Sequence, residues 1–263
     1  MLKILTVLKT GEDKEGKALK THGTRWTVDH VYKIKRMCEK YISKEFEFYC
    51  LTNEKEINCN SIPIENNWQG WWSKLELFKI KGPVLYLDLD VVIIKNIDTM
   101  LDKLKNINFA TTSNIPHMTI ESQFDTTAQN FKILEKWHPR YFLPRSRGVQ
   151  ASFMYWSNDV SCLYKRVHEL SLSEVISKMI SVQGDQNIVS FLLTEQPLDF
   201  WTPISMHPSI KNQEIVGFKG SLKRPDQGYK YWYNTNDQER INNIKIVIFH
   251  GRPRPWEQDI IPY

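Results

Sequence analysis

The run from Val84 to Ile94 constrains the fold of this chain more than any other stretch, because two carboxylates interrupt an otherwise apolar strand sequence, Val-Leu-Tyr-Leu-Asp-Leu-Asp-Val-Val-Ile-Ile. Burying an ionised carboxylate without a partner is costly, so Asp88 and Asp90 should lie where the strand reaches the surface, beside a positive group. At positions i and i+2 of an extended chain, both side chains point to the same side. This spacing predicts two carboxylates that can hold one cation between them.

Length and composition are those of an ordinary globular protein. The chain has 263 residues, of which 41% are hydrophobic and 25% charged, and we expect a single domain over residues 1–263. No apolar run is long enough to span a membrane, and the apolar start, Met1 to Leu8, is too short for a signal peptide, so we expect a cytoplasmic location. The net charge of +5 is compatible with an anionic small molecule or an anionic polymer as partner.

Strand-like and helix-like segments alternate along the chain, which predicts an α/β fold with a mostly parallel central sheet flanked by helices. Strands are expected at 2–8, 46–51, 84–94, 149–156 and 246–249. Thr27 is expected to cap a helix between the first two strands. Ser73-Lys74-Leu75-Glu76 matches a capping box, which predicts a second helix beginning near Ser73. A further helix should open at Gly184-Asp185-Gln186.

Two strand ends carry residues that suit a metal site. In an α/β sheet, ligands bind beyond the carboxyl ends of the strands, and Asp88 and Asp90 end one strand while His250 ends another. Two carboxylates and an imidazole leave open positions on a divalent ion that a diphosphate could fill, and the nitrogen ligand favours Mn²⁺ over Mg²⁺. Alternatively, the aspartates cap the next helix and His250 is a histidine at the edge of the core.

The segment after Phe249, His-Gly-Arg-Pro-Arg-Pro-Trp, suits a phosphate-bearing ligand. Gly251 lets the backbone approach a ligand closely, and Arg252 and Arg254 offer planar guanidinium donors for phosphate oxygens. The two prolines hold the segment extended, which lowers the entropy cost of presenting those arginines. The alternative is a proline-rich tail whose charges are solvated.

Together these residues have a family likeness. Leu85-Tyr86-Leu87-Asp88-Leu89-Asp90 with the late His-Gly-Arg-Pro-Arg-Pro-Trp resembles nucleotide-sugar glycosyltransferases of the GT-A fold, especially the family 8-like group. A group of bacterial and phage glycosyltransferases is similar also in Gly70-Trp71-Trp72-Ser73-Lys74-Leu75-Glu76-Leu77-Phe78 and in Gly184-Asp185-Gln186. The four pieces recur in the same order and span nearly the whole chain. The resemblance implies a Rossmann-like nucleotide-diphospho-sugar transferase fold and a metal-dependent transfer from a UDP-sugar or another nucleotide sugar.

The resemblance also implies a role for individual residues. Asp88, Asp90 and His250 would bind Mn²⁺ (or Mg²⁺), and Asp185 and Gln186 would face the sugar and the acceptor. The nucleotide sugar would be bound by Thr6, Leu8, Lys9, Lys74, Asp88, Leu89, Gly251, Arg252 and Arg254. The family usually places two more residues between the histidine and the basic position, so either arginine could contact the diphosphate. Lys74 could instead be a solvated lysine in a first helical turn, and Asp185 an N-cap.

The chemistry follows from charge, because breaking the sugar–phosphate bond leaves negative charge on the departing nucleoside diphosphate. A metal and the arginines would stabilise that charge, and the resemblance implies retention of the anomeric configuration. An inverting enzyme would need a carboxylate base near the acceptor, for which Asp185 is a candidate. The acceptor is left open as a glycan, a lipid, a protein or modified DNA.

Two regions are expected to lie around this site. The irregular stretch 112–147 interleaves aromatic and cationic residues, which suits sugar stacking on the acceptor side or a nucleic acid, or else a loop that buries its own aromatics. Residues 217–263 are expected to form a C-terminal arm that ends in the metal- and diphosphate-binding tail.

Two other functions are compatible with parts of the sequence. A phosphatase of the haloacid dehalogenase type also uses Asp-x-Asp after an apolar strand, although its motif usually opens the chain. A non-catalytic nucleic-acid-binding protein would explain the positive charge, but it leaves the paired aspartates unexplained.

Overall fold

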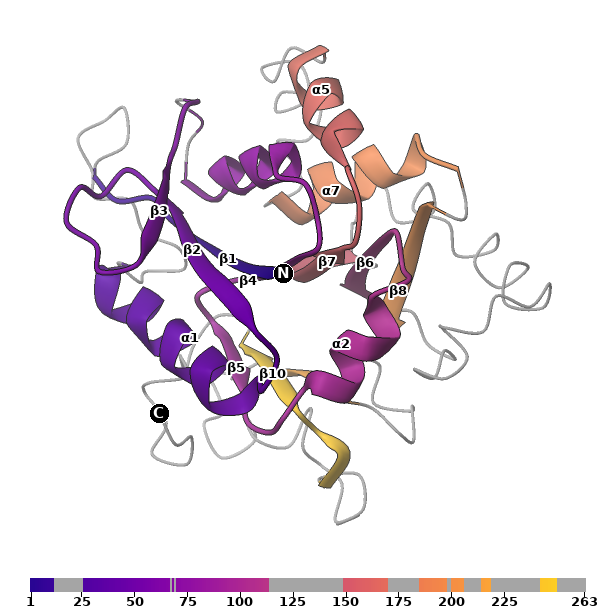
Figure 1. Cartoon of the computed structure of the whole chain (residues 1–263). Helices are drawn as coiled ribbons and strands as arrows, with labels where there is room; N and C mark the ends of the chain where they lie inside the picture. Colours follow the sequence, from indigo (N-terminus) through magenta and orange to yellow (C-terminus); the bar gives the residue numbers. More distant parts are fainter. Residues whose placement is uncertain are drawn as a thin grey trace, which may run out of the picture.

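The computed structural model describes residues 1–11, 26–66, 68, 70–113, 149–169, 185–197, 200–205, 214–218 and 242–249. Strands and helices alternate along most of this chain (Figure 1). The strands are β1 (Leu2–Leu8), β2 (Phe46–Thr52), β3 (Asn60–Pro63), β4 (Val84–Leu87), β5 (Val91–Ile93), β6 (Phe109–Ser113), β7 (Val149–Trp156), β8 (Trp201–Ser205), β9 (Ile215–Phe218) and β10 (Ile246–Phe249). The helices are α1 (Val28–Tyr41), the 3₁₀ helix η1 (Gly70–Lys79), α2 (Asp98–Leu104), α5 (Ser161–Glu169) and α7 (Asp185–Thr194).

The central sheet has seven strands in the order β3-β2-β1-β4-β7-β6-β8. The pairs β3–β2, β2–β1, β1–β4 and β6–β8 are parallel, and β7 is antiparallel to both of its neighbours. Every strand of this sheet except β7 therefore runs in the same direction. The predicted α/β fold with a mostly parallel sheet is confirmed.

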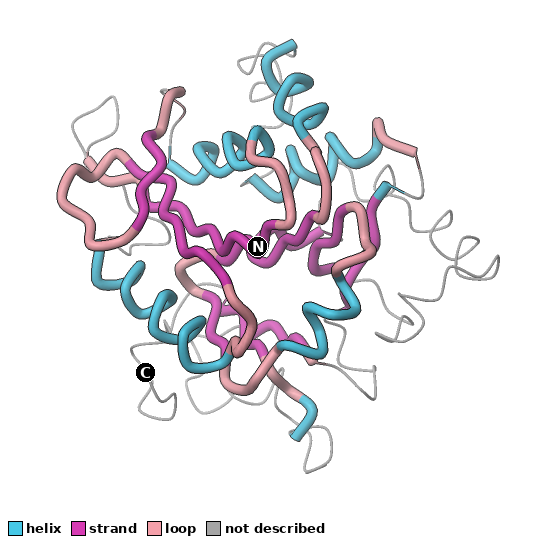
Figure 2. The backbone as a smooth tube through the Cα atoms, viewed as in Figure 1, coloured by secondary structure: helices cyan, strands magenta, loops and turns pink. Residues whose placement is uncertain are grey.

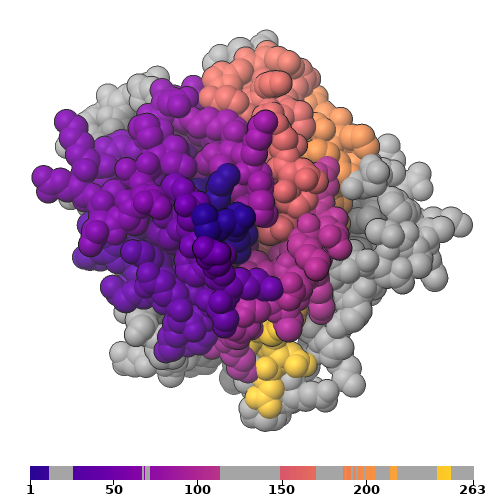
Figure 3. Space-filling view, in the orientation of Figure 1, coloured from indigo at the N-terminus to yellow at the C-terminus, as the bar shows by residue number. Residues whose placement is uncertain are grey.

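Two hydrophobic layers cover the sheet, one on each face. Figures 1 and 2 show η1, α5 and α7 on one face, and α1, α2 and the smaller sheet on the other. The first layer packs around Phe78, Trp156 and Leu192, and the second around Ile34, Leu101 and Ile248, all buried. In Figure 3 the N-terminal end of the chain (indigo) is visible on the near face of the molecule, and Met1 is 62% exposed. Within the described residues, no helix has the length and apolarity needed to span a bilayer.

A smaller sheet, β5-β10-β9, joins distant parts of the sequence. β10 pairs antiparallel with β5 and parallel with β9, and the backbone N–H of Phe249 donates to the carbonyl of Asp90 at 3.0 Å. This hydrogen bond fixes Phe249, the last residue of β10, beside Asp90.

The approach to β4 depends on a close contact between backbones. The Gly82 N–H donates to the Asn158 carbonyl at 2.9 Å, just beyond the end of β7. A Cβ atom at Gly82 would lie 2.5 Å from the carbonyl carbon of Ser157, so this contact requires glycine. It holds β4 against β7 and fixes where the acidic residues emerge from the sheet.

Two local predictions are wrong. The 84–94 run is not one strand, because residues 88–90 form a turn between β4 and β5, with the Val91 N–H donating to the Asp88 carbonyl at 3.1 Å. The expected extended, same-side geometry of the two aspartates therefore does not hold. The second helix begins at Gly70 and not near Ser73, and it is a 3₁₀ helix. Ser73 and Glu76 form no capping box there, because Ser73 donates to the Trp68 carbonyl and Glu76 accepts from the backbone N–H groups of residues 65 and 66.

Candidate active site

The carboxyl ends of β1, β2 and β4 meet at one edge of the sheet because the three strands are parallel neighbours. Beyond β1, the Thr10 N–H donates to Asn53 Oδ1 at 2.9 Å, and Asn53 Nδ2 donates back to the Thr10 carbonyl at 2.9 Å. The Thr10 hydroxyl also bonds to Glu54. The loops after β1 and β2 are therefore fixed to each other next to the turn that follows β4.

A buried ion pair occupies this edge. Lys74 Nζ lies 2.9 Å from Asp88 Oδ1 and 3.1 Å from Asp88 Oδ2, so the ammonium contacts both carboxylate oxygens. The Lys74 side chain is only 4% exposed, whereas that of Asp88 is 25% exposed. The alternative that Lys74 is a solvated lysine is therefore wrong, and the expectation of a positive group beside Asp88 is confirmed.

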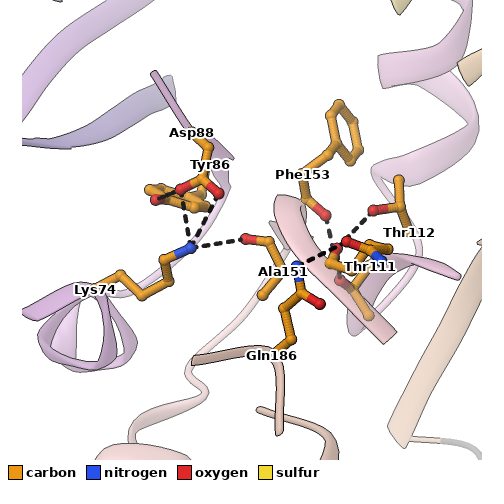
Figure 4. Close-up of polar contacts among 9 residues, drawn as sticks. Lys74, Tyr86, Asp88, Thr111, Thr112, Ala151, Phe153 and Gln186 are labelled. Atoms are coloured by element: carbon orange, nitrogen blue, oxygen red, sulfur yellow. Dashed lines mark hydrogen bonds and ion pairs between the residues drawn. The ribbon is translucent and has the colours of Figure 1, made fainter. Parts of the chain in front are cut away.

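Three further groups fix this pair (Figure 4). The Tyr86 hydroxyl bonds to Asp88 Oδ1, and Lys74 Nζ lies 5.2 Å from the centre of the Tyr86 ring. The Asp88 N–H donates to the Ser152 carbonyl at 2.8 Å, and Lys74 also donates to the Ala151 carbonyl at 3.4 Å. Sequence reasoning missed Tyr86 and the start of β7. The alternating strand pattern could have placed Tyr86 on the same side as Asp88, but nothing local indicates the pairing with β7.

Asp90 and Leu89 lie in the turn beyond Asp88. Leu89 is 9% exposed and packs against the core, while one carboxylate oxygen of Asp90, Oδ1, is buried. The carbonyl of Asp90 accepts from Phe249 at 3.0 Å. The turn therefore places both aspartates of the motif at the junction of the two sheets.

A second polar contact lies along the same edge, at the start of α7. Gln186 Nε2 donates to Gln150 Oε1 at 2.7 Å. The hydroxyls of Thr111 and Thr112 donate to the Gln150 carbonyl at 3.1 and 2.6 Å and so hold its backbone in place. Gln150 is adjacent in sequence to Ala151, which bonds to Lys74, so β7 links Gln186 to the ion pair (Figure 4). Gln150 was not predicted from the sequence.

The residues predicted at the end of β1 lie at this edge too. Leu8 is buried, and the buried hydroxyl of Thr6 makes no hydrogen bond within the described part of the chain. Lys9 Nζ bonds to the Trp68 carbonyl. Burial lowers the pKa of Lys9 below its usual range, and the carboxylate of Glu76 opposes part of that shift.

Glu76 anchors the loop that Lys9 contacts. Its side chain is fully buried, and its carboxylate accepts from the backbone N–H groups of Glu65 at 3.0 Å and Asn66 at 2.8 Å. Lys79 pairs with the same carboxylate at 3.2 Å. The loop continues to Trp68, whose carbonyl also accepts from Ser73 at 3.3 Å. Glu76 thus fixes the loop that lies over the end of β1.

Several predicted residues lie outside the described residues. They are His250, Gly251, Arg252 and Arg254, most of the acceptor-side stretch 112–147, and most of the arm 217–263. Asp185 begins α7, as the sequence predicts, but its side chain is also outside what the structure describes. In the described part of the chain, no three side chains of His, Cys, Asp and Glu form a group that could hold a metal.

Comparisons with known proteins identify the fold. No protein-family profile and no curated protein sequence matches the chain. Among solved structures, the galactosyltransferase LgtC, in complex with donor and acceptor sugar analogues, matches with a TM-score of 0.51 and 13% identity over 98% of this chain and 90% of its own. The glycosyltransferase GlyE of Streptococcus pneumoniae TIGR4 matches with a TM-score of 0.53 and 11% identity over 97% of this chain and 56% of its own.

The likeness to LgtC extends along nearly the whole of both chains, whereas this chain spans just over half of GlyE. At these identities a structural match establishes the fold. The GT-A fold that the sequence motifs imply is thereby confirmed, and the chain has the fold of family 8-like glycosyltransferases.

Proposed function

We propose that the protein is a metal-dependent glycosyltransferase that moves a sugar from a UDP-sugar or another nucleoside-diphosphate sugar to an acceptor, with retention of the anomeric configuration. The observation that carries this proposal is the Asp88–Asp90 turn at the carboxyl edge of a glycosyltransferase-type sheet. Ligands of open α/β sheets bind at that edge. LgtC, which has the same fold, was solved with donor and acceptor sugar analogues.

The donor chemistry of the turn fits a divalent ion. Asp88 and Asp90 supply carboxylate oxygens, which Mn²⁺ and Mg²⁺ both accept as ligands. The hydrogen bond from Phe249 to Asp90 holds the end of β10 at this turn, and His250 is the next residue in the sequence. We assign Asp88, Asp90 and His250 as the metal ligands. When bound, the metal would supply Lewis-acid stabilisation of the diphosphate leaving group.

The chain's own residues would bind and orient the donor. Thr6, Leu8 and Lys9 would border the nucleotide, because they end the strand next to β4. Lys74 would supply a positive charge at the diphosphate, together with Arg252 or Arg254 from the C-terminal tail. Asp185 and Gln186 would face the sugar and the acceptor, and the bond from Gln186 to Gln150 would keep the Gln186 amide at the edge of the sheet. The acceptor is a glycan, a lipid, a protein or modified DNA.

Donor hydrolysis tests the proposal without knowledge of the acceptor. The purified protein would be incubated with a panel of nucleotide sugars, with and without Mn²⁺, and the release of nucleoside diphosphate would be followed. We expect slow release from one donor, and we expect chelation of the metal to abolish it. Release of inorganic phosphate from simple phosphate esters would favour the phosphatase instead, and binding of DNA with a steep salt dependence but no metal dependence would favour the nucleic-acid-binding protein.

A further inference from the structure

Glu54 is fixed at the end of β2, beside the loop that follows β1. Its backbone N–H donates to the Thr52 hydroxyl at 3.0 Å, and its carboxylate accepts from the Thr10 hydroxyl. The neighbouring Asn53 exchanges two hydrogen bonds with the Thr10 backbone, both at 2.9 Å, which fastens the two loops together around the carboxylate. A half-buried negative charge is therefore held at the same edge of the sheet as the Asp88–Asp90 turn.

The order of the strands sets the order in which the parts of a nucleotide sugar can lie along this edge. The sheet contains the run β7-β4-β1-β2, and the start of β7 lies beside the end of β4 because these two strands are antiparallel. The proposed function puts the diphosphate at the turn after β4 and the sugar at Gln186, which bonds to Gln150 on β7. The nucleoside, on the other side of the diphosphate, then extends over the ends of β1 and β2. Neighbouring strands are about 4.8 Å apart, so the end of β2 lies roughly 10 Å along the edge from that of β4, within the length of a nucleoside diphosphate.

A carboxylate at this place suits a nucleoside and not a phosphate. Two negative groups repel each other, so Glu54 would weaken the binding of a diphosphate that lay against it. A nucleoside offers ribose hydroxyls and base N–H groups, and a charged acceptor forms stronger hydrogen bonds with such donors than a neutral one. A carboxylate can accept several hydrogen bonds, so the bond from Thr10 leaves lone pairs for a ligand. Dinucleotide-binding α/β folds use an acidic side chain in this way on the ribose.

We propose that Glu54 is a nucleoside-binding residue, whose carboxylate accepts a hydrogen bond from a ribose hydroxyl or a base N–H group of the donor. The inference rests on the proposed function, because the positions of the diphosphate and the sugar define the side on which the nucleoside lies. Glu54 then makes the site select a donor that carries a nucleoside over a ligand that offers phosphate groups alone. The Thr10 hydroxyl keeps the carboxylate in place for this contact.

Calorimetry with ligands that differ in their nucleoside tests this role. UDP, 2′,3′-dideoxy-UDP and inorganic pyrophosphate would be titrated with Mn²⁺ into the wild-type protein and into Glu54→Ala, and the ADP, CDP and GDP series would be titrated in the same way. We expect Glu54→Ala to bind UDP about tenfold more weakly than wild type, the effect of one hydrogen bond to a charged group, and to bind pyrophosphate as wild type does. A loss with UDP but not with 2′,3′-dideoxy-UDP identifies a ribose hydroxyl as the partner, and an equal loss with both identifies a base N–H group.

Three further variants separate a contact with the ligand from an effect on the loops. Thr10→Val removes the hydrogen bond to Glu54 and keeps the carboxylate, so its UDP affinity should stay closer to wild type than that of Glu54→Ala. Glu54→Gln keeps an acceptor on a side chain of the same length and should recover part of the UDP affinity. Glu56→Ala removes the same charge from an exposed side chain in the same segment and should bind UDP like wild type.

The outcomes separate this inference from the function on which it rests. Wild-type UDP affinity in Glu54→Ala would overturn the role of Glu54 and leave the proposed function standing. An equal loss of UDP and pyrophosphate binding, or an equal loss of UDP binding in Glu54→Ala and Thr10→Val, would also overturn it, because Glu54 would then act by holding the loop after β1. If wild type binds no nucleoside diphosphate with Mn²⁺, the proposed function fails and the role of Glu54 fails with it.

Discussion

Replacing Asp90 by asparagine is expected to lower the metal-dependent turnover of the nucleotide sugar by about 1000-fold or more, because a metal ligand contributes several kcal/mol of leaving-group stabilisation. The substitution keeps the size of the side chain, and the bond from Phe249 to the Asp90 backbone carbonyl does not depend on the side chain. The fold should therefore persist. The measurement is the release of nucleoside diphosphate in the presence of Mn²⁺, with circular dichroism as the check on folding.

Asp102→Asn provides the matched control for this variant. Asp102, on α2, makes an exposed ion pair with Lys44, and the Asp102 side chain is 55% exposed. The Asp102→Asn variant should turn over the donor at the wild-type rate. A folded Asp90→Asn protein that kept metal-dependent turnover within a factor of about ten would contradict the assignment of Asp90 as a metal ligand.

Glu76→Ala is expected to destabilise the protein by about 3 kcal/mol, because it leaves two backbone N–H groups and a lysine without their buried acceptor. Those groups are the N–H of Glu65 and of Asn66, and the ammonium of Lys79. Urea unfolding followed by circular dichroism measures the change. The stability of Glu76→Gln should lie between those of wild type and Glu76→Ala, because the amide oxygen of glutamine can still accept a hydrogen bond from one of the three donors.

Glu65→Ala is the control for burial, because Glu65 is an exposed carboxylate that pairs with the same lysine as the buried Glu76. Glu65 also contacts Lys79, at 2.9 Å, but its side chain is 63% exposed. Exposed ion pairs contribute little, so we expect a change within about 0.5 kcal/mol. Equal destabilisation by Glu76→Ala and Glu65→Ala would show that the anchoring of the 65–68 loop does not depend on the burial of Glu76.

The sequence predicts the strands well where apolar runs are bounded by clear breaks. The expected strands at 2–8, 149–156 and 246–249 coincide with β1, β7 and β10. β7 and β10 are almost wholly buried and β1 is buried over most of its length, so burial and local preference favour the same conformation. Thr27 is likewise the N-cap of α1, as predicted, and its backbone N–H donates to Nδ1 of His30 at 3.1 Å.

The local predictions failed where contacts distant in sequence decide the structure. The 84–94 run has the composition of one strand, but Asp88 bonds to Ser152 and Lys74 on one side of the turn, and β5 pairs with β10 on the other. Similarly, Ser73 and Glu76 match a capping box, yet their partners belong to the loop before the helix. No local pattern contains this information, because the partner is chosen by the tertiary fold.

One feature of the candidate site was predicted, the positive neighbour of Asp88, whereas the contacts of the site were not. The need of Asp88 for a positive neighbour follows from the cost of burying a carboxylate, and Lys74 fulfils it. The identity of that neighbour could not be derived, because the sequence does not show that η1 packs beside the end of β4. The same holds for Gln150, which meets Gln186 only because β7 runs antiparallel through an otherwise parallel sheet.

The most direct test of the central claim is calorimetric titration of UDP and other nucleoside diphosphates into the wild-type protein, with Mn²⁺ and with a chelator in its place. The proposed metal-dependent glycosyltransferase predicts that at least one nucleoside diphosphate binds with Mn²⁺ and that this binding is lost with the chelator. Binding of equal strength with and without Mn²⁺, or no binding of any nucleoside diphosphate, would contradict the account.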